Sequence, residues 1–278
     1  MDRGWILITG CSTGIGRALV GELRGRGFGV VATARKAEAL ADLPAGPDLR
    51  FLALDVTEAA SIAAAVEACR DLRLVGLVNN AGYGQVGPLE LLTADELRTQ
   101  FETNVLGLHA VTRAFLPLIR AKARKGEGRI VQVASMLGRL SIPLAGAYNA
   151  SKHAAVALAE TLRLEVGDEV PVILVEPGAI RTAFRHTLSK VWGDLPERAT
   201  GTRYERILRA YMEKRGNMGD RFAMDVAPCA RKIARAIASP RPPRRVVIGK
   251  DAFWAGKAKA ILPAWLWERM LRRAYGLR

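Results

Sequence analysis

Two residues with acid/base potential, Tyr148 and Lys152, are four positions apart, and Ser135 precedes Tyr148 by thirteen positions. If residues 146–166 are helical, Tyr148 and Lys152 lie on one face, so an ammonium group stands beside a phenol. A nearby cation favours the phenolate form, which makes tyrosine usable as a proton donor and acceptor. The same spacing also arises by chance in helices, so it indicates an acid/base site only if other features of the chain agree with one.

A glycine-rich run directly follows a short apolar segment at residues 5–9. The run consists of Gly10, Cys11, Ser12, Thr13, Gly14, Ile15 and Gly16. The pattern predicts strand, tight turn and helix, in which glycines let the backbone approach a pyrophosphate that binds at the helix N-terminus. Because the run has both flanking elements, it indicates a dinucleotide site more strongly than glycines alone.

The second predicted strand ends with Thr33, where an NAD-specific domain places an acid near the adenine ribose. Ala34, Arg35 and Lys36 stand there instead. A guanidinium suits a 2′-phosphate, so Arg35, with Ser12 as a weaker contact, favours NADP(H) over NAD(H). The alternative is that Arg35 is a solvated residue at a strand end.

These features resemble the short-chain dehydrogenase/reductase family over residues 5 to about 183. The matching segments are Thr9-Gly10 with Gly14-Ile15-Gly16, Asp55, Asn79-Asn80-Ala81-Gly82, Asn104, Ser135, Tyr148 with Lys152, and Pro177-Gly178 with Thr182. Several motifs agree in their order along the chain, which makes the set far more specific than any single one.

The resemblance implies hydride transfer between nicotinamide C4 and a carbonyl or alcohol carbon, with Asn104, Ser135, Tyr148 and Lys152 as the catalytic residues. Tyr148 would exchange a proton with the substrate oxygen, which Ser135 positions, while Asn104 supports Lys152. The candidate cofactor site comprises Gly10, Ser12, Thr13, Gly14, Ile15, Gly16, Arg35, Asp55, Val56, Asn80, Ala81, Gly82, Tyr148, Lys152, Pro177, Gly178, Ile180 and Thr182.

The predicted fold is α/β, a Rossmann doubly wound, seven-stranded parallel sheet. The predicted strands lie near residues 5–9, 28–33, 50–54, 74–79, 129–134, 171–176 and 245–248. Long helices are expected at 94–122 and 147–166, and in the family their outer faces often pair two subunits, so a homodimer or homotetramer is expected. Residues 1–183 and 184–278 belong to one domain, the second part adding a substrate lid and a C-terminal helical extension.

Substrate choice is expected within residues 184–223, where the family pattern fades. Apolar side chains there are Phe184, Leu188, Val191, Trp192, Leu195, Tyr204, Ile207, Leu208, Tyr211, Met212, Met218 and Phe222. As a set they favour a lipophilic carbonyl or alcohol, although each residue alone is explained as well by packing of the lid onto the core.

The C-terminal tail alternates apolar and basic residues, and Pro263 separates two short predicted helices. The apolar members are Phe253, Trp254, Ile261, Leu262, Trp265, Leu266, Trp267, Met270 and Leu271, and the basic ones are Lys257, Lys259, Arg269, Arg272 and Arg273. This composition is typical of an amphipathic element that contacts an anionic membrane from one side. The alternative is that the tail covers the substrate pocket or a subunit interface.

Composition excludes some other classes. The net charge of +15 accompanies no nucleic-acid-binding motif, and the three cysteines and three histidines have no metal-ligand spacing. A first strand at residue 5 leaves no room for a signal peptide, which favours the cytoplasm. A non-catalytic dinucleotide-binding regulator and an NAD-dependent alcohol dehydrogenase are the alternatives. The short chain, Asn104 and the Asn79–Gly82 pattern argue against a lyase or epimerase of the extended branch of the family.

Overall fold

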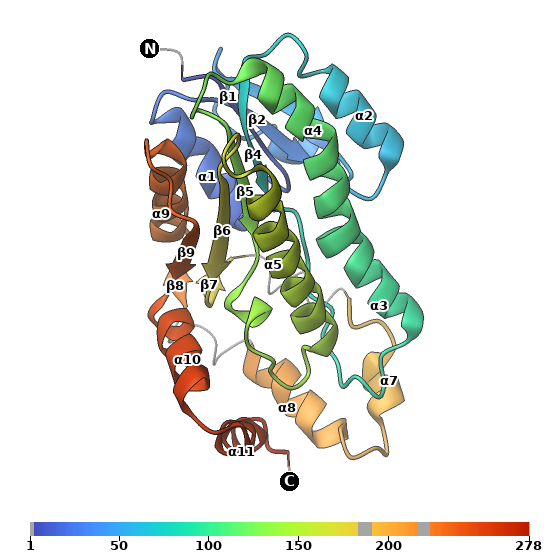
Figure 1. Cartoon of the computed structure of the whole chain (residues 1–278). Helices are drawn as coiled ribbons and strands as arrows, with labels where there is room; N and C mark the ends of the chain where they lie inside the picture. Colours follow the sequence, from blue (N-terminus) through green and yellow to red (C-terminus); the bar gives the residue numbers. More distant parts are fainter. Residues whose placement is uncertain (1–2, 183–190, 216–222, 278) are drawn as a thin grey trace.

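The structure, a computed structural model, describes residues 3–182, 191–215 and 223–277. A seven-stranded parallel sheet in the order β3-β2-β1-β4-β5-β6-β9 runs through its centre (Figure 1). The strands are β1 Trp5–Ile8, β2 Gly29–Ala34, β3 Leu49–Ala53, β4 Leu74–Asn79, β5 Arg129–Val133, β6 Val172–Pro177 and β9 Arg245–Ile248. All seven predicted strands are confirmed to within one residue at each end, and the strand order reverses between β1 and β4, where such sheets bind ligands.

Helices cover both faces of the sheet because alternate strand residues point to opposite sides. Ile6 and Ile8 of β1 pack in the cluster formed with α1 (Gly14–Arg24) and α9 (Val226–Ala238). Leu7 lies between them in the sequence and packs on the other face, with α2 (Ala59–Glu67) and α4 (Leu108–Lys122). The strands are therefore buried on both faces, as expected for an all-parallel sheet.

The predicted helix 94–122 is not one regular helix. It consists of α3 (Ala94–Phe101), a π-helical turn η2 (Glu102–Gly107) and α4. The wider turn begins just before Asn104, which is fully buried and hydrogen-bonded to the backbone of Tyr83 rather than to its own helix. The other long helix is confirmed as α5 (Gly146–Val166).

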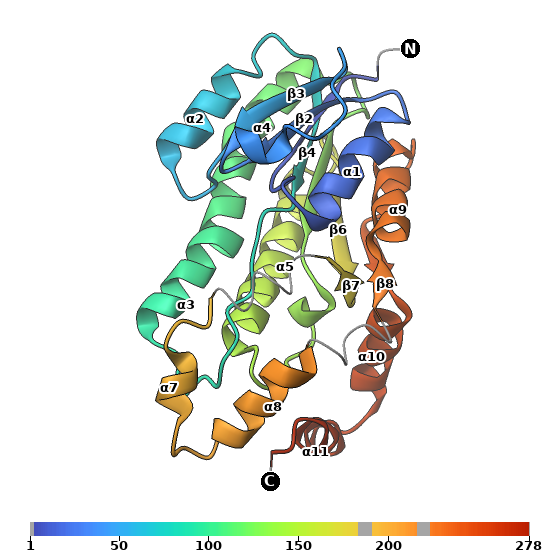
Figure 2. The same cartoon turned by 180° about the vertical axis from the view of Figure 1, so that it is seen from behind.

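The second half of the chain adds elements beyond the carboxyl edge of the sheet (Figures 1 and 2). These are the paired strands β7 Ile180–Arg181 and β8 Met224–Asp225, α7 Leu195–Ala199, α8 Glu205–Arg215, α10 Lys250–Ile261 and α11 Ala264–Ala274. Two short helices lie earlier in the chain, η1 Ala37–Leu40 after β2 and η3 Met136–Gly138 after β5. Pro263 separates α10 from α11 as predicted. Within the described residues, no helix combines the length and the apolar character that crossing a bilayer requires.

Thr9 joins the ends of β1 and β4. Its buried hydroxyl oxygen accepts hydrogen bonds from the backbone N–H groups of Asn80 and Ala81, both at 2.9 Å. The Asn80 side chain in turn donates to the carbonyls of Thr9 and Gly10 at 2.9 and 3.0 Å. The first glycine turn and the Asn79–Gly82 segment are thereby fixed to each other.

We expect Thr9→Val to lower the free energy of unfolding by roughly 3 kcal/mol, because it leaves two backbone N–H groups at this junction without an acceptor. Thr9→Ser keeps the hydroxyl and is the matched control, with an expected loss of about 1 kcal/mol for the missing methyl group. Urea unfolding of the three proteins measures both changes. Equal stability of the Val and Ser variants would contradict the role of the hydroxyl.

Candidate active site

Tyr148 and Lys152 both lie in the first two turns of α5, as the spacing predicted. The Lys152 Nζ atom is 5.8 Å from the centre of the Tyr148 ring. Lys152 is 5 % exposed, and its ammonium donates a hydrogen bond to the Val133 carbonyl at 2.9 Å. Val133 is the last residue of β5, so α5 brings this cation to the carboxyl edge of the sheet.

Burial lowers the pKa of Lys152 to about 8. The cause is loss of hydration, which penalises the charged form of an amine. Lys152 nevertheless keeps its proton at neutral pH. A desolvated ammonium acts on nearby groups with less screening than one in water.

Asn104 is placed by the π-helical turn η2. Its amide oxygen accepts from the Tyr83 N–H at 3.1 Å, and its amide nitrogen donates to the Tyr83 carbonyl and to the Ser151 hydroxyl. A Cβ on Gly82 would stand 2.9 Å from the Asn104 Oδ1 atom and 3.7 Å from Lys152 Nζ. Asn104 and Lys152 therefore flank Gly82, and no larger residue fits between them.

Ser135 follows β5 and lies next to α5. It caps the short helix η3, and its hydroxyl oxygen accepts from the Leu137 N–H at 3.1 Å. The loop is pressed against α5, because a Cβ on Gly138 would come within 2.8 Å of the Lys152 carbonyl oxygen. All four predicted catalytic residues thus lie on α5 or on segments that contact it.

The glycine turn forms an open cradle at the start of α1. Gly10 and Gly14 have positive φ angles of 72° and 62°, and a Cβ on Gly16 would meet the Asn80 side chain and the Gly10 carbonyl at 2.5 Å. Thr13 is the N-cap of α1, and its side chain makes no capping hydrogen bond. The Thr13 side chain does not occupy the first N–H groups of α1, and the glycine cradle at this helix N-terminus fits the phosphates of a dinucleotide.

The predicted adenosine side lies at the ends of β2 and β3. The Asp55 carboxylate accepts from the N–H and hydroxyl of Thr57 at 3.0 and 2.7 Å, and Val56 is buried beside Gly107. These contacts fix the Asp55 loop. Arg35 comes directly after β2 and is exposed, at the place where the sequence predicted a 2′-phosphate contact.

The Pro177-Gly178 segment leaves β6 and crosses toward the glycine turn. Gly178 donates its N–H to Ile248 in β9 at 2.7 Å, and Ile180 pairs with Met224 in the small sheet. Thr182 then reaches the first turn, with its Cβ atom 3.3 Å from where a Cβ on Gly14 would stand. The predicted nicotinamide segment and the predicted phosphate cradle are thus neighbours.

Asp251, in the first turn of α10, is a site residue that the sequence motifs did not reveal. Its carboxylate accepts from the Ala179 N–H at 2.6 Å. It fills the space beside Gly178, where a Cβ would lie 2.2 Å from its Oδ1 atom. The available signal was an acid three residues after the last predicted strand, where parallel strands often present functional side chains.

A buried ion pair makes a second connection between the Ser135 loop and the sheet. Glu176, in β6, is fully buried, and its carboxylate lies 2.9 Å from the Arg139 Nε atom and 3.7 Å from the Arg245 guanidinium. Burial raises the pKa of Glu176, while the two cations oppose that shift. The Arg139 guanidinium also lies about 3.6 Å from the Cβ position of Gly256 in α10.

An apolar cluster lies just before α5. Val86 and Leu144 are buried there, and the residues packed against them are Trp192, Ile207, Tyr211 and Tyr275. Leu144 has a positive φ of 63°, and its carbonyl accepts from the Gly87 N–H at 2.8 Å. Leu144, whose backbone conformation is strained, precedes Tyr148 by four residues along the chain.

Six of the predicted substrate-pocket residues belong to two apolar clusters. Trp192, Ile207 and Tyr211 belong to the apolar cluster before α5, whereas Leu195, Leu208 and Met212 pack α7 and α8 onto Leu91 and Leu92. The second cluster therefore serves lid packing. Two others make polar contacts, since the Val191 carbonyl accepts from the Gln85 side chain and the Tyr204 hydroxyl donates to Glu90. Phe184, Leu188, Met218 and Phe222 lie outside the described residues, so their predicted role is a prediction only.

Comparison with known sequences identifies the family of this chain. Residues 4–191 match the short chain dehydrogenase family. An uncharacterized oxidoreductase from Escherichia coli, YbbO, is 33% identical over 96% of this chain and 93% of its own length. Human retinol dehydrogenase 16 is 31% identical over 96% of this chain and 87% of its own.

Comparison with solved structures gives the same fold with either dinucleotide. A short chain dehydrogenase from Burkholderia cenocepacia in complex with NADP has a TM-score of 0.74 and 26% identity, covering 98% of this chain and 99% of that one. A short chain dehydrogenase/reductase from Burkholderia phymatum in complex with NAD has a TM-score of 0.76 and 28% identity, covering 91% of both chains.

We expect Asp251→Ala to raise the dissociation constants of NADP and NAD roughly tenfold, because a charge-assisted hydrogen bond to the Ala179 N–H is lost and the Pro177–Ala179 turn loosens. Asp168→Ala, in the exposed turn after α5, is the matched control and should bind normally. Calorimetric titration measures both constants. Unchanged affinity in Asp251→Ala would show that the turn holds its shape without the carboxylate.

Proposed function

This chain belongs to the short-chain dehydrogenase family and is an oxidoreductase of alcohols and carbonyl compounds with NAD(P), and we propose that its cofactor is NADP(H). We propose further that its substrate is lipophilic and that Tyr148 is its acid/base. The observation that carries this proposal is the buried Lys152 ammonium, 5.8 Å from the Tyr148 ring at the carboxyl edge of the sheet. A solvated lysine at the same spacing would favour the phenolate form of Tyr148 far less, because water screens its charge.

The proposed chemistry has two parts. The bound dinucleotide supplies or accepts the hydride at nicotinamide C4. In the reducing direction, Tyr148 donates its phenolic proton to the carbonyl oxygen as negative charge develops there, and in the oxidising direction it accepts the proton. The Ser135 hydroxyl donates a hydrogen bond to the same oxygen and sets its position.

Lys152 favours the phenolate form of Tyr148 by its charge. Its hydrogen bond to the Val133 carbonyl uses one of three N–H donors, so the others can bind ribose hydroxyls. Asn104 is a positioning residue in this scheme, because it ties the π-helical turn to Ser151, one residue before Lys152 in α5. The arrangement keeps Lys152 facing Tyr148.

The proposed preference for NADP(H) rests on Arg35. It stands exposed at the end of β2, and no acid occupies positions 34–36, where a free 2′-hydroxyl would need an acceptor. A guanidinium can form two parallel hydrogen bonds with a phosphate, which is strong and geometrically specific.

The proposed lipophilic substrate rests on the apolar cluster of Val86, Leu144, Trp192, Ile207 and Tyr211. Leu144 lies just before α5 and precedes Tyr148 by four residues, and α8 contributes Ile207 and Tyr211 to the cluster. The similarity to retinol dehydrogenase 16 agrees with a substrate of this class. A strongly hydrated substrate would leave its hydroxyl groups unpaired against such a surface.

A homodimer is proposed through the outer faces of α3, η2 and α5. Leu97, Leu106 and Leu164 are exposed on these elements, with Leu164 at 88 % exposure. Burial of such side chains against a second copy would remove apolar surface from water.

The first test is Tyr148→Phe. We expect kcat to fall by about a thousandfold, because the hydroxyl that exchanges the proton is lost, while the dissociation constant of NADPH stays within about twofold. Activity is followed as NADPH oxidation over a panel of aliphatic, aromatic and steroidal ketones. Tyr204→Phe, a lid variant that loses only a hydrogen bond to Glu90, is the control, and near-normal turnover in Tyr148→Phe would overturn the mechanism.

The second test is Arg35→Ser. We expect kcat/KM for NADPH to fall at least about tenfold and kcat/KM for NADH to change little, because only the phosphate contact is removed. Arg70→Ser, at an exposed site after α2, controls for the loss of one positive charge. An unchanged ratio between the two cofactors would reject Arg35 as the selecting residue and leave the redox proposal intact.

A further inference from the structure

Large apolar side chains reach the surface mainly at the C-terminal end of the chain. Among the described residues nine are exposed, and five of them lie in α10, α11 or the turn beside them: Phe253, Trp254, Ile261, Trp265 and Met270. Trp254 and Trp265 are each 64 % exposed and Ile261 is 80 % exposed. Scattered exposed apolar residues are ordinary, whereas a group of this kind marks an interaction surface.

Helix α11 has an apolar stripe that the rest of the protein covers only in part. Leu266, Trp267, Met270 and Leu271 recur at the spacing that places residues on one helical face. None of the residues of α11 is buried. Leu266, Trp267 and Leu271 are half-buried, whereas Trp265 and Met270 are exposed. The apolar side of an amphipathic helix is stabilised by packing, and the described residues of this chain supply only part of it.

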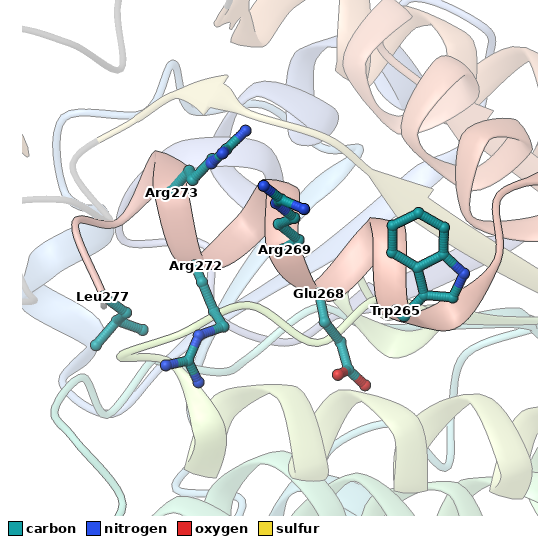
Figure 3. Close-up of a pocket in the computed structure, with 6 residues that line it drawn as sticks. All are labelled: Trp265, Glu268, Arg269, Arg272, Arg273 and Leu277. Carbon is teal, nitrogen blue, oxygen red and sulfur yellow. The ribbon is translucent and has the colours of Figure 1, made fainter.

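Basic side chains accompany the apolar ones. An open groove of about 510 Å³ runs along α11 and is lined by Trp265, Glu268, Arg269, Arg272, Arg273 and Leu277. Figure 3 shows the three guanidinium groups and the Trp265 ring projecting from the helix. On α10, the Lys257 ammonium lies 4.7 Å from the centre of the exposed Phe253 ring.

The net charge of this segment is positive. Residues 250–277 contain six lysines and arginines and two acids. One of the acids, Asp251, is turned inward onto the Ala179 N–H. The surface of α10 and α11 therefore presents cations beside aromatic rings.

We propose that α10 and α11 dock the protein onto an anionic phospholipid surface. The aromatic and aliphatic side chains would enter the boundary between headgroups and acyl chains, where tryptophan is favoured. The lysines and arginines would extend their charged ends to the lipid phosphates. Both helices lie on the surface, so the contact is peripheral.

The docking surface adjoins the proposed substrate side. Tyr275, just after α11, lies 6.5 Å from Tyr211 of α8 between ring centres, and both contact the apolar cluster of Val86 and Leu144. A lipophilic substrate that leaves the bilayer would therefore meet that cluster first. This step rests on the proposed function, whereas docking itself does not.

The test is flotation of the full-length protein with vesicles. We expect binding to vesicles of phosphatidylcholine with phosphatidylglycerol, little binding to phosphatidylcholine alone, and loss of binding in high salt. The triple variant Arg269→Gln/Arg272→Gln/Arg273→Gln should weaken binding at least about tenfold. The double variant Trp254→Ser/Trp265→Ser should also lose binding, because the apolar contact is removed.

A charge-matched control separates this surface from the overall positive charge. Arg70→Gln/Arg98→Gln/Arg231→Gln removes the same charge from exposed positions after α2, on α3 and on α9, and it should bind vesicles normally. Dinucleotide titration and thermal unfolding confirm that each variant is folded. Point variants are preferable to truncation, because truncation would also remove Asp251.

Three outcomes would overturn the proposal. They are absence of vesicle binding, equal loss in the two arginine triples, and equal binding to neutral and anionic vesicles. Dimer dissociation in the tryptophan variant without any vesicle binding would assign the surface to a second copy instead. Because no arm of the experiment measures turnover, its failure leaves the proposed redox reaction unaffected.

Discussion

The arrangement of the site depends on one buried cation. Burial lowers the pKa of Lys152 to about 8, which corresponds to a cost of roughly 3 kcal/mol in folding while the side chain carries its proton. That cost is fully present below about pH 8, where folded and unfolded chains are both protonated. The fold offsets it only in part, through one carbonyl at the end of β5. In the proposed function, the other N–H donors of Lys152 bind ribose hydroxyls of the cofactor.

A buried cation acts on a fixed neighbour only if the loops at the carboxyl edge of the sheet keep their positions. Side chains that hydrogen-bond to backbone groups hold these loops in place. Thr9 fixes the glycine turn to the Asn80 segment, and Asn104 fixes η2 to Tyr83. Asp251 does the same for Ala179. These bonds come from distant parts of the chain, so the site is assembled by the whole sheet and not by a single supersecondary unit.

The sequence was sufficient for the strands and for the residues that follow them, because apolar runs ending in glycine, asparagine or proline mark buried parallel strands directly. It was insufficient for features that depend on contacts across the fold. The π-helical turn at Asn104 interrupts a helix whose periodicity looks regular, because Asn104 bonds to the Tyr83 backbone instead. Asp251 belongs to no motif, and its partner Ala179 is seventy-two residues away.

The C-terminal tail packs inward with some of its residues and exposes others. Its pattern of aromatic and basic residues was compatible with covering the pocket or with contacting a membrane. In the structure, one set of tail residues faces inward: Asp251 contacts Ala179, Gly256 lies near Arg139, and Tyr275 lies near Tyr211. Another set, Trp254, Ile261 and Trp265, faces outward. Because a helix presents opposite faces at different positions of its repeat, inward packing does not compete with outward exposure. Helix α10 carries both Trp254, on the proposed docking surface, and Asp251, which holds the Pro177–Ala179 turn. A membrane that contacted this surface would therefore contact the helix that positions the turn.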